Sequence, residues 1–349
     1  MLRRTRRLLW IIAAVVGFIA VAVFLRFKSP PEAARLLPES DGILYVNLRP
    51  LRALVHPRMA AVTPAPDYQQ FLDATGFVWE RDLDQAAIAL HRMADPRGPN
   101  GPVAYSMVLV GRLDGRRIAT WLAAHAATRE DYVGQIIYSL PSDGRTVRIA
   151  QIGYDTIAIS NTPTPEQIHS ILDRHRTAAL PFVGSTLLAR HWAEIPLLSF
   201  AWGMGQIGLP LTESGAIHIF GLALPLPPET TFLASLRWVG SLRLRVEEIA
   251  PSDQAATSQM ATLGLLFALA RGATASLAPT PANRGLEQLL ASAQLSTRRD
   301  RVVLRAQLPA KTLIDLLETP TSADPGNAAA LASAPAPAST ASSAPAPPR

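Results

Sequence analysis

The chain has 349 residues, with 33 basic and 27 acidic side chains and no cysteine. Six of the basic residues and none of the acidic ones fall within residues 1–28, so the rest of the chain is balanced in charge. A nucleic-acid-binding domain concentrates Lys and Arg on its folded body, and this distribution argues against that class. The absence of cysteine excludes disulfides, a thiolate nucleophile, a cysteine-based zinc site and a lipid anchor on a terminal cysteine.

An apolar run from Leu8 to Leu25 holds 18 residues without a charge. As a helix it measures about 27 Å, close to the ~30 Å hydrocarbon core of a bilayer. Arginines before it and basic residues after it favour a cytoplasmic N-terminus and an exported body. We therefore expect a signal anchor in residues 1–28 that contacts the lipid bilayer through residues 8–27. The body is then expected on the outer side of the inner membrane, in the periplasm or the extracellular space.

Two other export signals compete with this interpretation. Ala20-Val21-Ala22 has the small-x-small form that signal peptidases accept, so the segment is alternatively a cleaved signal peptide. Residues 5–9 partly resemble a twin-arginine signal, although so continuous an apolar run is more typical of ordinary secretion. The length of the run favours the uncleaved anchor.

Residues 319–349 consist mainly of Ala, Pro, Ser and Thr, with Leu331 as the only large aliphatic side chain. Such a segment buries too little apolar surface to offset chain entropy, so it is predicted to be a disordered tail. An inert tail is favoured over one that contacts the cell wall or a partner. Between anchor and tail, two exported halves are expected, residues 29–180 and residues 181–318.

The first half is predicted to mix strands and helices. A helix over residues 164–174 opens with a capping box, Thr164-Pro165-Glu166-Gln167, with proline at the first helical position. Another helix over residues 116–127 shows apolar side chains at helical spacing. The alternation of apolar residues predicts strands at 43–48, 85–90, 103–113, 133–140, 146–152 and 156–160.

The second half begins with strands expected at 197–202 and 216–224. A hairpin follows, because apolar residues alternate over 232–238 and again over 242–246, with Arg243, Arg245 and Glu247 on the opposite, polar face. Ser252 is expected to cap a long helix, in which residues 263–270 are too few to span a bilayer and are predicted to form a buried helix. The fold class is therefore α+β.

An internal repeat supports two related halves. At a constant offset of 145, seven residues of the first half match chemically similar residues of the second half: Asp155, Ile157, Ile159, Ile168, Ile171, Leu172 and Asp173 align with Asp300, Val302, Leu304, Leu313, Leu316, Leu317 and Glu318. Each half is expected to run hairpin, helix, hairpin, helix, packed about a pseudo-twofold axis. The competing explanation is chance, since the same alternation recurs in any α+β chain.

No catalytic motif is convincing, and we predict no catalytic, cofactor-binding or metal-ligating residue. Gly203 to Gly208 spell Gly-x-Gly-x-x-Gly, but Pro210 stands where the helix should begin, so a flexible loop is expected there. His169 and Asp173 share a helix face that His175 leaves, which favours a solvated polar face over a metal site. Asp82 and Asp84 are assigned to turn chemistry.

The remaining candidates have no partner visible in the sequence. Three tryptophans are a possible pocket lining, but core packing is favoured for each of them: Trp192, Trp202 and Trp238. Five isolated histidines are expected in the core or on the surface: His56, His91, His125, His191 and His218.

Residues 36–46 read Leu-Leu-Pro-Glu-Ser-Asp-Gly-Ile-Leu-Tyr-Val. Together with the basic anchor and the repeated α+β units, they resemble uncharacterised bacterial membrane-anchored exported families that carry a Leu-Pro turn before a Tyr-Val strand. The motif transfers no functional residue. We expect a membrane-anchored binding or scaffolding protein with an envelope protein partner and without catalysis. The alternatives are an exported hydrolase with a site assembled from distant loops, and a carrier of an apolar ligand between the halves.

Overall fold

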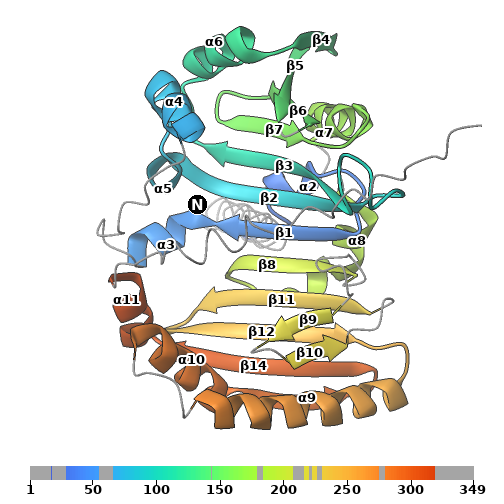
Figure 1. The fold of residues 1–349 in the computed structure, drawn as a ribbon, viewed down its shortest axis with the longest axis vertical. Coiled ribbons are helices and arrows are strands. Elements are labelled where there is room, and N and C mark those ends of the chain that lie inside the picture. The colour runs from blue at the N-terminus through green and yellow to red at the C-terminus, as the bar shows by residue number, and fades with distance from the viewer. Residues whose placement is uncertain are drawn as a thin grey trace, which may run out of the picture.

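A twelve-stranded antiparallel sheet runs through the whole body of the protein in the computed structural model (Figure 1). The structure describes residue 17 and residues 29–54, 66–142, 144–178, 184–206, 216–219, 222–225, 230–274 and 280–318. The expected anchor, apart from residue 17, and the expected tail lie outside these ranges. Within them, no helix is both long enough and apolar enough to cross a membrane.

The sheet order is β13-β14-β12-β11-β8-β1-β2-β3-β7-β6-β5-β4. The strands are β1 Gly42–Asn47, β2 Leu83–Arg92, β3 Val103–Gly111, β4 Thr128–Tyr132, β5 Gln135–Ser142, β6 Arg145–Gln151, β7 Thr156–Ser160, β8 Ser199–Gln206, β11 Thr231–Trp238, β12 Ser241–Ile249, β13 Gln294–Arg298 and β14 Arg301–Pro309. A separate hairpin pairs β9 Ala216–Ile219 with β10 Leu222–Pro225. This arrangement confirms the α+β fold class and its antiparallel hairpins.

The strand order is arranged symmetrically about the central pair β1 and β8. Outward from β1 come β2, β3, β7 and β6, and outward from β8 come β11, β12, β14 and β13. In each direction a hairpin, a helical segment and a second hairpin follow one another along the chain. The strands aligned by the 145-residue offset, β7 and β14, hold equivalent places, since β7 pairs with β3 and β14 pairs with β12.

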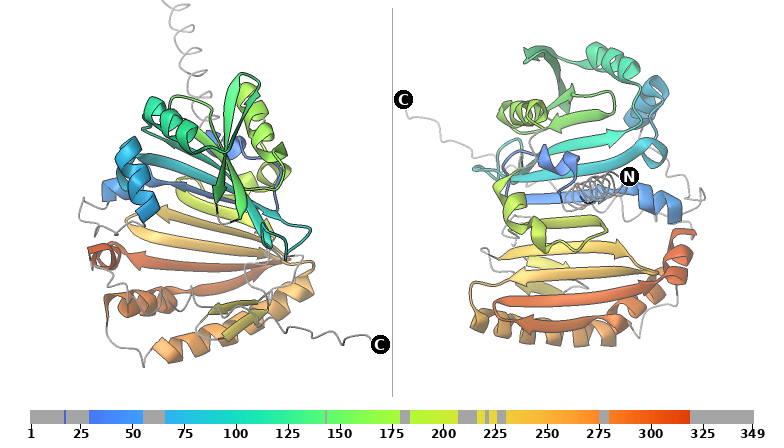
Figure 2. Two further views of the ribbon diagram at one scale, coloured as in Figure 1. Left: turned by 45° about the horizontal axis from the view of Figure 1, so that its top comes forward. Right: turned by 180° about the vertical axis from the view of Figure 1, so that it is seen from behind.

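Helices cover both faces of the sheet (Figure 2). The face to which Tyr45 points carries α2 Glu32–Arg35, α7 Glu166–Arg176 and α8 Thr186–His191, followed by the 3-10 turn η1 Trp192–Glu194. The opposite face, to which Leu44 points, carries α4 Pro66–Thr75, α5 Trp79–Asp82 and α6 Gly115–His125 at one end and α9 Asp253–Thr274 and α10 Pro281–Ser292 at the other. Helix α3 Leu48–Leu54 follows β1, and α11 Ala310–Glu318 packs against α10.

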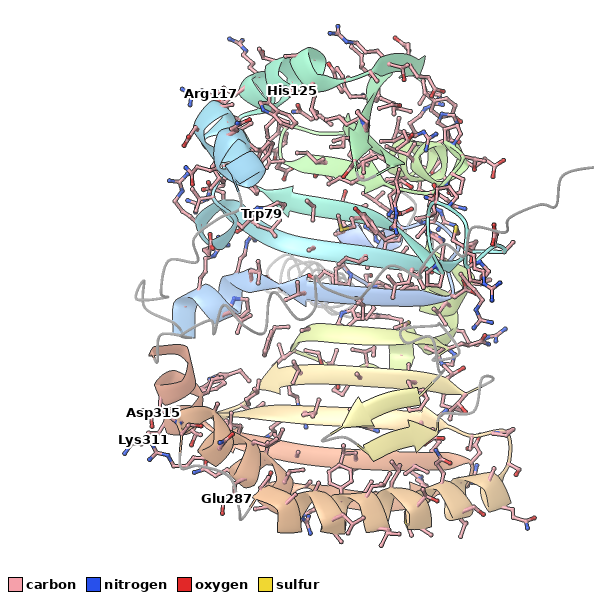
Figure 3. All side chains as sticks on the ribbon, viewed as in Figure 1. Trp79, Arg117, His125, Glu287, Lys311 and Asp315 are labelled. Carbon is pink, nitrogen blue, oxygen red and sulfur yellow. The ribbon has the colours of Figure 1, made fainter. Side chains whose placement is uncertain are left out.

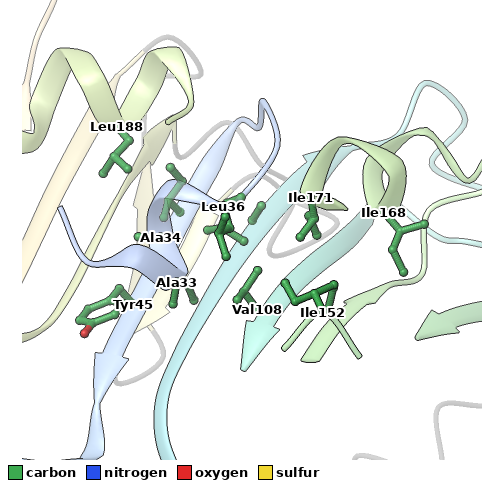
Figure 4. Packing of buried hydrophobic residues seen from close by; sticks show 14 of the residues in the cluster. Ala33, Ala34, Leu36, Tyr45, Val108, Ile152, Ile168, Ile171 and Leu188 are labelled. Atoms are coloured by element: carbon green, nitrogen blue, oxygen red, sulfur yellow. The ribbon is translucent and has the colours of Figure 1, made fainter. Parts of the chain in front are cut away.

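The main core lies on the Tyr45 face, under the short helix α2 (Figure 4). Ala33, Ala34 and Leu37 of this segment are fully buried against β2 and β3. Small alanines let the helix approach the sheet closely, since Ala87 and Ala89 on β2 are also fully buried. The Leu-Pro segment of the sequence is therefore the cover of the core, and it fixes where the chain enters the fold.

Two expected strands differ in the structure. The strand expected at 133–140 begins in a turn and is β5, the second strand of a hairpin whose first strand was not predicted. Residues 128–132 form β4, and Val133 and Gly134, with φ of 49° and 79°, form the turn to β5. The sequence Thr-Arg-Glu-Asp-Tyr shows no apolar alternation because β4 is the outermost strand of the sheet and most of its side chains are exposed. The strand expected at 216–224 is divided into β9 and β10.

Two helix predictions also need correction. Ser252 does cap α9, accepting a hydrogen bond from the Ala255 amide at 3.1 Å. Helix α9 is not buried, however, because it packs at the end of the sheet and leaves Leu265 63% exposed. The capping box before α7 is not formed, since Pro165 is the N-cap residue and no side chain caps the helix.

Candidate functional site

A cavity of about 870 Å³ lies at one end of the β1–β8 pair, on the Tyr45 face. Its walls come from the chain that enters the fold, residues 29–33, and from residues 192–199, which lead into β8. The sheet contributes Tyr45 and Asn47 of β1, and Arg245 of β12. Residues of both predicted halves therefore meet here, next to the position where the expected anchor ends. We call this space the seam cavity.

One wall of the seam cavity is aromatic. Tyr45 lines it and stacks on Trp202 at a ring distance of 5.2 Å. Trp192 also lines it and meets Trp202 edge to face at 5.5 Å. Burial raises the pKa of Tyr45 to about 12, against the opposing charge of Arg49, so its hydroxyl stays neutral and donates to Gln85 Oε1 at 3.0 Å. This wall offers flat apolar surface with fixed polar edges.

A chain of ion pairs that crosses three elements links two residues lining the cavity, Glu194 and Arg245. Glu194 of η1 accepts from Arg301 of β14 and lies 3.1 Å from His191 Nδ1. Arg301 also reaches Glu247 Oε2 of β12 at 3.4 Å, and Glu247 pairs with Arg245 on the same strand. Burial raises the pKa of Glu194, but the hydrogen bonds and charges of Arg301 and His191 outweigh it, so the pKa lies below its usual value. The carboxylate is thus charged at neutral pH.

Two buried N–H groups beside these walls have no hydrogen-bond partner within the described part of the protein. They are Nε of Arg245, which lines the cavity, and Nε1 of Trp202, which packs behind Tyr45 and Trp192. Leaving a buried donor unpaired costs free energy, and a hydrogen-bond acceptor on a ligand would recover that cost. The cavity therefore combines apolar surface with a lining residue, Arg245, whose Nε donor is unpaired in the described part of the protein.

The rim of the cavity includes an apolar turn, Pro196 to Ser199. The Ser199 amide and hydroxyl both donate to the Pro196 carbonyl, at 3.3 and 2.7 Å, which closes the turn. At its third position Leu198 has φ of 65°, a conformation that normally requires glycine. The strand expected at residues 197–202 therefore begins two residues later, and Leu197 and Leu198 project from the turn with 57% and 79% of their surface exposed.

The three tryptophans that were considered either as a pocket lining or as core residues do not all behave alike. Trp202 is buried, as expected for a core residue. Trp192 instead lines the seam cavity, so the pocket alternative holds for this one. Trp238 is half-buried at the end of β11. Only the tertiary structure separates them, because all three lie at spacings that suit a core.

The Gly203–Gly208 string is not a flexible loop over its first half. Gly203 and Gly205 lie in β8, one of the two central strands, and residues 207–215 lie outside the described ranges. A Cβ atom at Gly205 would lie 2.6 Å from the Gly42 Cα atom of β1. These glycines therefore serve the close approach of β1 and β8.

The polar face of α7 leaves Asp173 exposed, as expected, and in addition meets side chains of β4. His169 Nε2 lies 2.8 Å from Glu130 Oε1, and its ring stacks on Tyr132 at 3.8 Å. The Tyr132 hydroxyl donates to Asp173 Oδ2 at 3.0 Å. Within the described residues, no three His, Asp or Glu side chains are grouped so as to hold a metal ion.

Asp82 and Asp84 lie where β2 begins, and both form ion pairs with arginines. Asp82 pairs with Arg81 at 2.6 Å and accepts from the Val78 amide at 3.0 Å. Asp84 pairs with Arg49 at 2.7 Å and with Arg52. The predicted turn role is wrong for both, because Asp82 ends α5 and Asp84 lies in β2, and both instead form ion pairs.

The isolated histidines have individual surroundings. His91 is buried and lies 3.0 Å from the Ser106 hydroxyl. His125, exposed at the end of α6, stacks on Trp121 at 4.2 Å (Figure 3). His191 is buried beside Glu194. His56 and the side chain of His218 lie outside the described part of the structure.

The sequence does not predict the chain of ion pairs beside the cavity. Arg245 and Glu247 were placed correctly on one polar face of the hairpin, yet nothing in the local pattern connects them to Glu194 or Arg301. The alternation of β12 carried the signal that these charges point the same way. Arg301 lies 54 residues from Glu247 and 107 residues from Glu194 along the chain, so only the fold brings these three together.

The fold is an antiparallel α+β fold with a cavity of mixed apolar and polar lining at the seam of its central strands. No family model and no curated protein matches the chain. Solved structures of TP0453 are similar, with a TM-score of 0.44 for crystal form III and 0.42 for crystal form I. Each is 11% identical and covers 83% and 84% of this chain and 98% and 100% of TP0453. Similarity at this level carries no argument about the chemistry of the site.

Proposed function

We propose that the protein is a single-pass, membrane-anchored binding protein of the bacterial envelope, with the seam cavity as its ligand site. The observation that carries this proposal is a cavity of about 870 Å³ built from both halves of the sheet and from the first described residues after the anchor segment. Ligand cavities typically measure roughly 300–1,000 Å³, with mostly apolar walls and a few polar groups. The volume lies within that range, the aromatic wall supplies apolar surface, and Arg245 with its unpaired Nε supplies a polar group.

The ligand that fits has an apolar body and one hydrogen-bond acceptor. The body would pack on Tyr45 and Trp192, and the acceptor would take the Nε proton of Arg245. The carrier alternative, in which an apolar ligand binds between the halves, is compatible with this proposal, because residues of both halves line the cavity. The hydrolase alternative finds less support, because the Ser199 hydroxyl at the rim already donates to the Pro196 carbonyl at 2.7 Å.

The anchor is proposed on the sequence alone, from the 18-residue apolar run and the basic residues on both sides of it. On this basis the N-terminus is cytoplasmic and the body lies outside the cytoplasmic membrane. The mirrored strand order about β1 and β8 supports the further proposal that the two halves arose by duplication. An envelope protein partner stays a prediction.

Native mass spectrometry of the full-length protein, extracted from membranes in mild detergent, tests the binding site. We expect a bound small molecule that is lost in an Arg245→Gln variant, because that change removes the free Nε donor. Arg243→Gln is the matched control, since Arg243 lies two residues earlier on the same strand and face, is exposed and does not line the cavity. A wild-type protein that carries no ligand, or equal loss in both variants, would contradict the proposal.

A further inference from the structure

Exposed apolar side chains gather at the mouth of the seam cavity. Leu197 and Leu198, 57% and 79% exposed, line the cavity from the closed turn before β8. Tyr154, 86% exposed, directly precedes Asp155, which lines the same cavity from the turn between β6 and β7. Single exposed apolar residues are common on protein surfaces, but two adjacent exposed leucines at one opening, with exposed Tyr154 next to a lining residue, indicate an interaction surface.

The turn that holds the leucines is built to expose them. Two hydrogen bonds to the Pro196 carbonyl close it, and the left-handed backbone at Leu198 is strained for any residue with a Cβ atom. A strained conformation that places a large apolar side chain in water opposes stability and indicates a function that needs the exposed side chain. The surroundings of the turn indicate what that function is.

The position of the anchor limits how far this rim can lie from lipid. Ser29 and Pro30 line the cavity, and the apolar run ends only four residues before Ser29, at Leu25. Four residues of extended chain reach at most about 14 Å. The wall of the cavity that contains Ser29 is thereby held within the width of the headgroup layer and the water next to it.

We propose that Leu197, Leu198 and Tyr154 insert into the bilayer interface, so that the seam cavity opens onto the membrane surface. This inference rests on the anchor in the proposed function and adds to it a second contact between the protein and the lipid. Leucine suits burial among acyl chains, while tyrosine places an apolar ring and a polar hydroxyl at the headgroup level. The partner is the lipid bilayer itself.

Site-specific fluorescence in the full-length protein tests this inference. The chain has no cysteine, so Leu198→Cys and Tyr154→Cys each create one labelling site for an environment-sensitive dye. The labelled proteins are reconstituted in vesicles of phosphatidylethanolamine and phosphatidylglycerol that contain lipids with a nitroxide quencher near the headgroup. We expect a blue shift and a loss of emission at both positions.

Two control positions match the first probe. Val133 is also an exposed aliphatic residue with a positive φ, at 43% exposure and 49°, but it lies in the turn beside the outermost strand β4. Leu265, 63% exposed on α9, represents the other apolar surface at the far end of the sheet. We expect Val133→Cys and Leu265→Cys proteins to keep their emission.

Vesicle flotation of the same samples separates failure of this inference from failure of the anchor. Protein that floats but is quenched no more at position 198 than at position 133 would overturn the inserted rim and leave the anchor standing. Protein that floats and is quenched at position 265 instead would also overturn it and assign the contact to α9. Protein that does not float would contradict the anchor itself, and the inference with it.

Discussion

A buried carboxyl group on β12 shows how a single residue sets a pH dependence. Glu248 is 3% exposed on the Leu44 face, and its cross-strand neighbours are Phe232 and Val302. Its Oε2 atom has no hydrogen-bond partner in the described part of the protein. Burial raises its pKa to about 7, so the side chain is largely protonated in the folded state below neutral pH.

We predict that the free energy of unfolding of the wild type falls between about pH 5 and pH 8, and that the Glu248→Gln variant does not show this fall. The pKa in the folded state is about 7, above the ordinary carboxyl value of 4.5, so the folded protein binds the extra proton, and stability falls as the pH rises through this range. The difference corresponds to about 3 kcal/mol at pH 8. Urea unfolding of the full-length protein in detergent at pH 5 and pH 8 measures it.

The control for this prediction is Glu194→Gln. The pKa of Glu194 lies below its ordinary value because Arg301 and His191 stabilise its charge more than burial disfavours it. Its contribution is present above the ordinary carboxyl pKa and is lost as the pH falls through the folded-state value, so this variant should be less stable than the wild type at pH 8. Equal pH profiles for wild type and Glu248→Gln would contradict a neutral buried Glu248.

At the scale of elements, the approach of β8 to β1 depends on glycine. A Cβ atom at Gly205 would lie 2.6 Å from Gly42 Cα and 2.7 Å from the Asp41 carbonyl oxygen. Both contacts are with backbone atoms of the segment that enters β1, which cannot move without shifting the strand. The same string of glycines that resembles a nucleotide-binding motif thus serves to join the central strands.

We predict that Gly205→Ala lowers the free energy of unfolding by about 1–3 kcal/mol, the usual cost of overpacking. Gly264→Ala is the control, because Gly264 lies within α9 and a Cβ atom there would have no neighbour within 4 Å. Alanine is the better helix former, so this second change should raise stability by about 1 kcal/mol. Denaturant unfolding compares the two, and equal effects of both substitutions would refute the role assigned to Gly205.

For the whole molecule, the continuous sheet predicts that the two halves unfold together. The β1–β8 pairing joins a strand of each half along the full length of β1 except Asn47. We expect one transition when unfolding is followed by dyes at Leu265→Cys on α9 and at Val133→Cys beside β4. Midpoints that differ between these two ends of the sheet would show that the halves are separate units.

Local patterns in the sequence predicted much of the fold. The hairpin of β11 and β12, the strands β1, β2, β3, β6 and β7, and the cap at Ser252 follow from alternation, turn residues and capping chemistry. The hairpin β4–β5 was missed because an edge strand needs no apolar face. Helix α9 was expected to be buried because local composition does not reveal how much of a helix the sheet covers.

The sequence by itself determined the α+β class, most strands and the predicted export signal, because these depend on patterns among neighbouring residues. Only the tertiary structure decided that Trp192 lines a cavity, that Arg245 keeps a free donor there, and that Leu198 stands exposed at its rim. The physical reason is distance along the chain. The walls of the seam cavity come from segments up to about two hundred residues apart, and no local pattern encodes which of them meet.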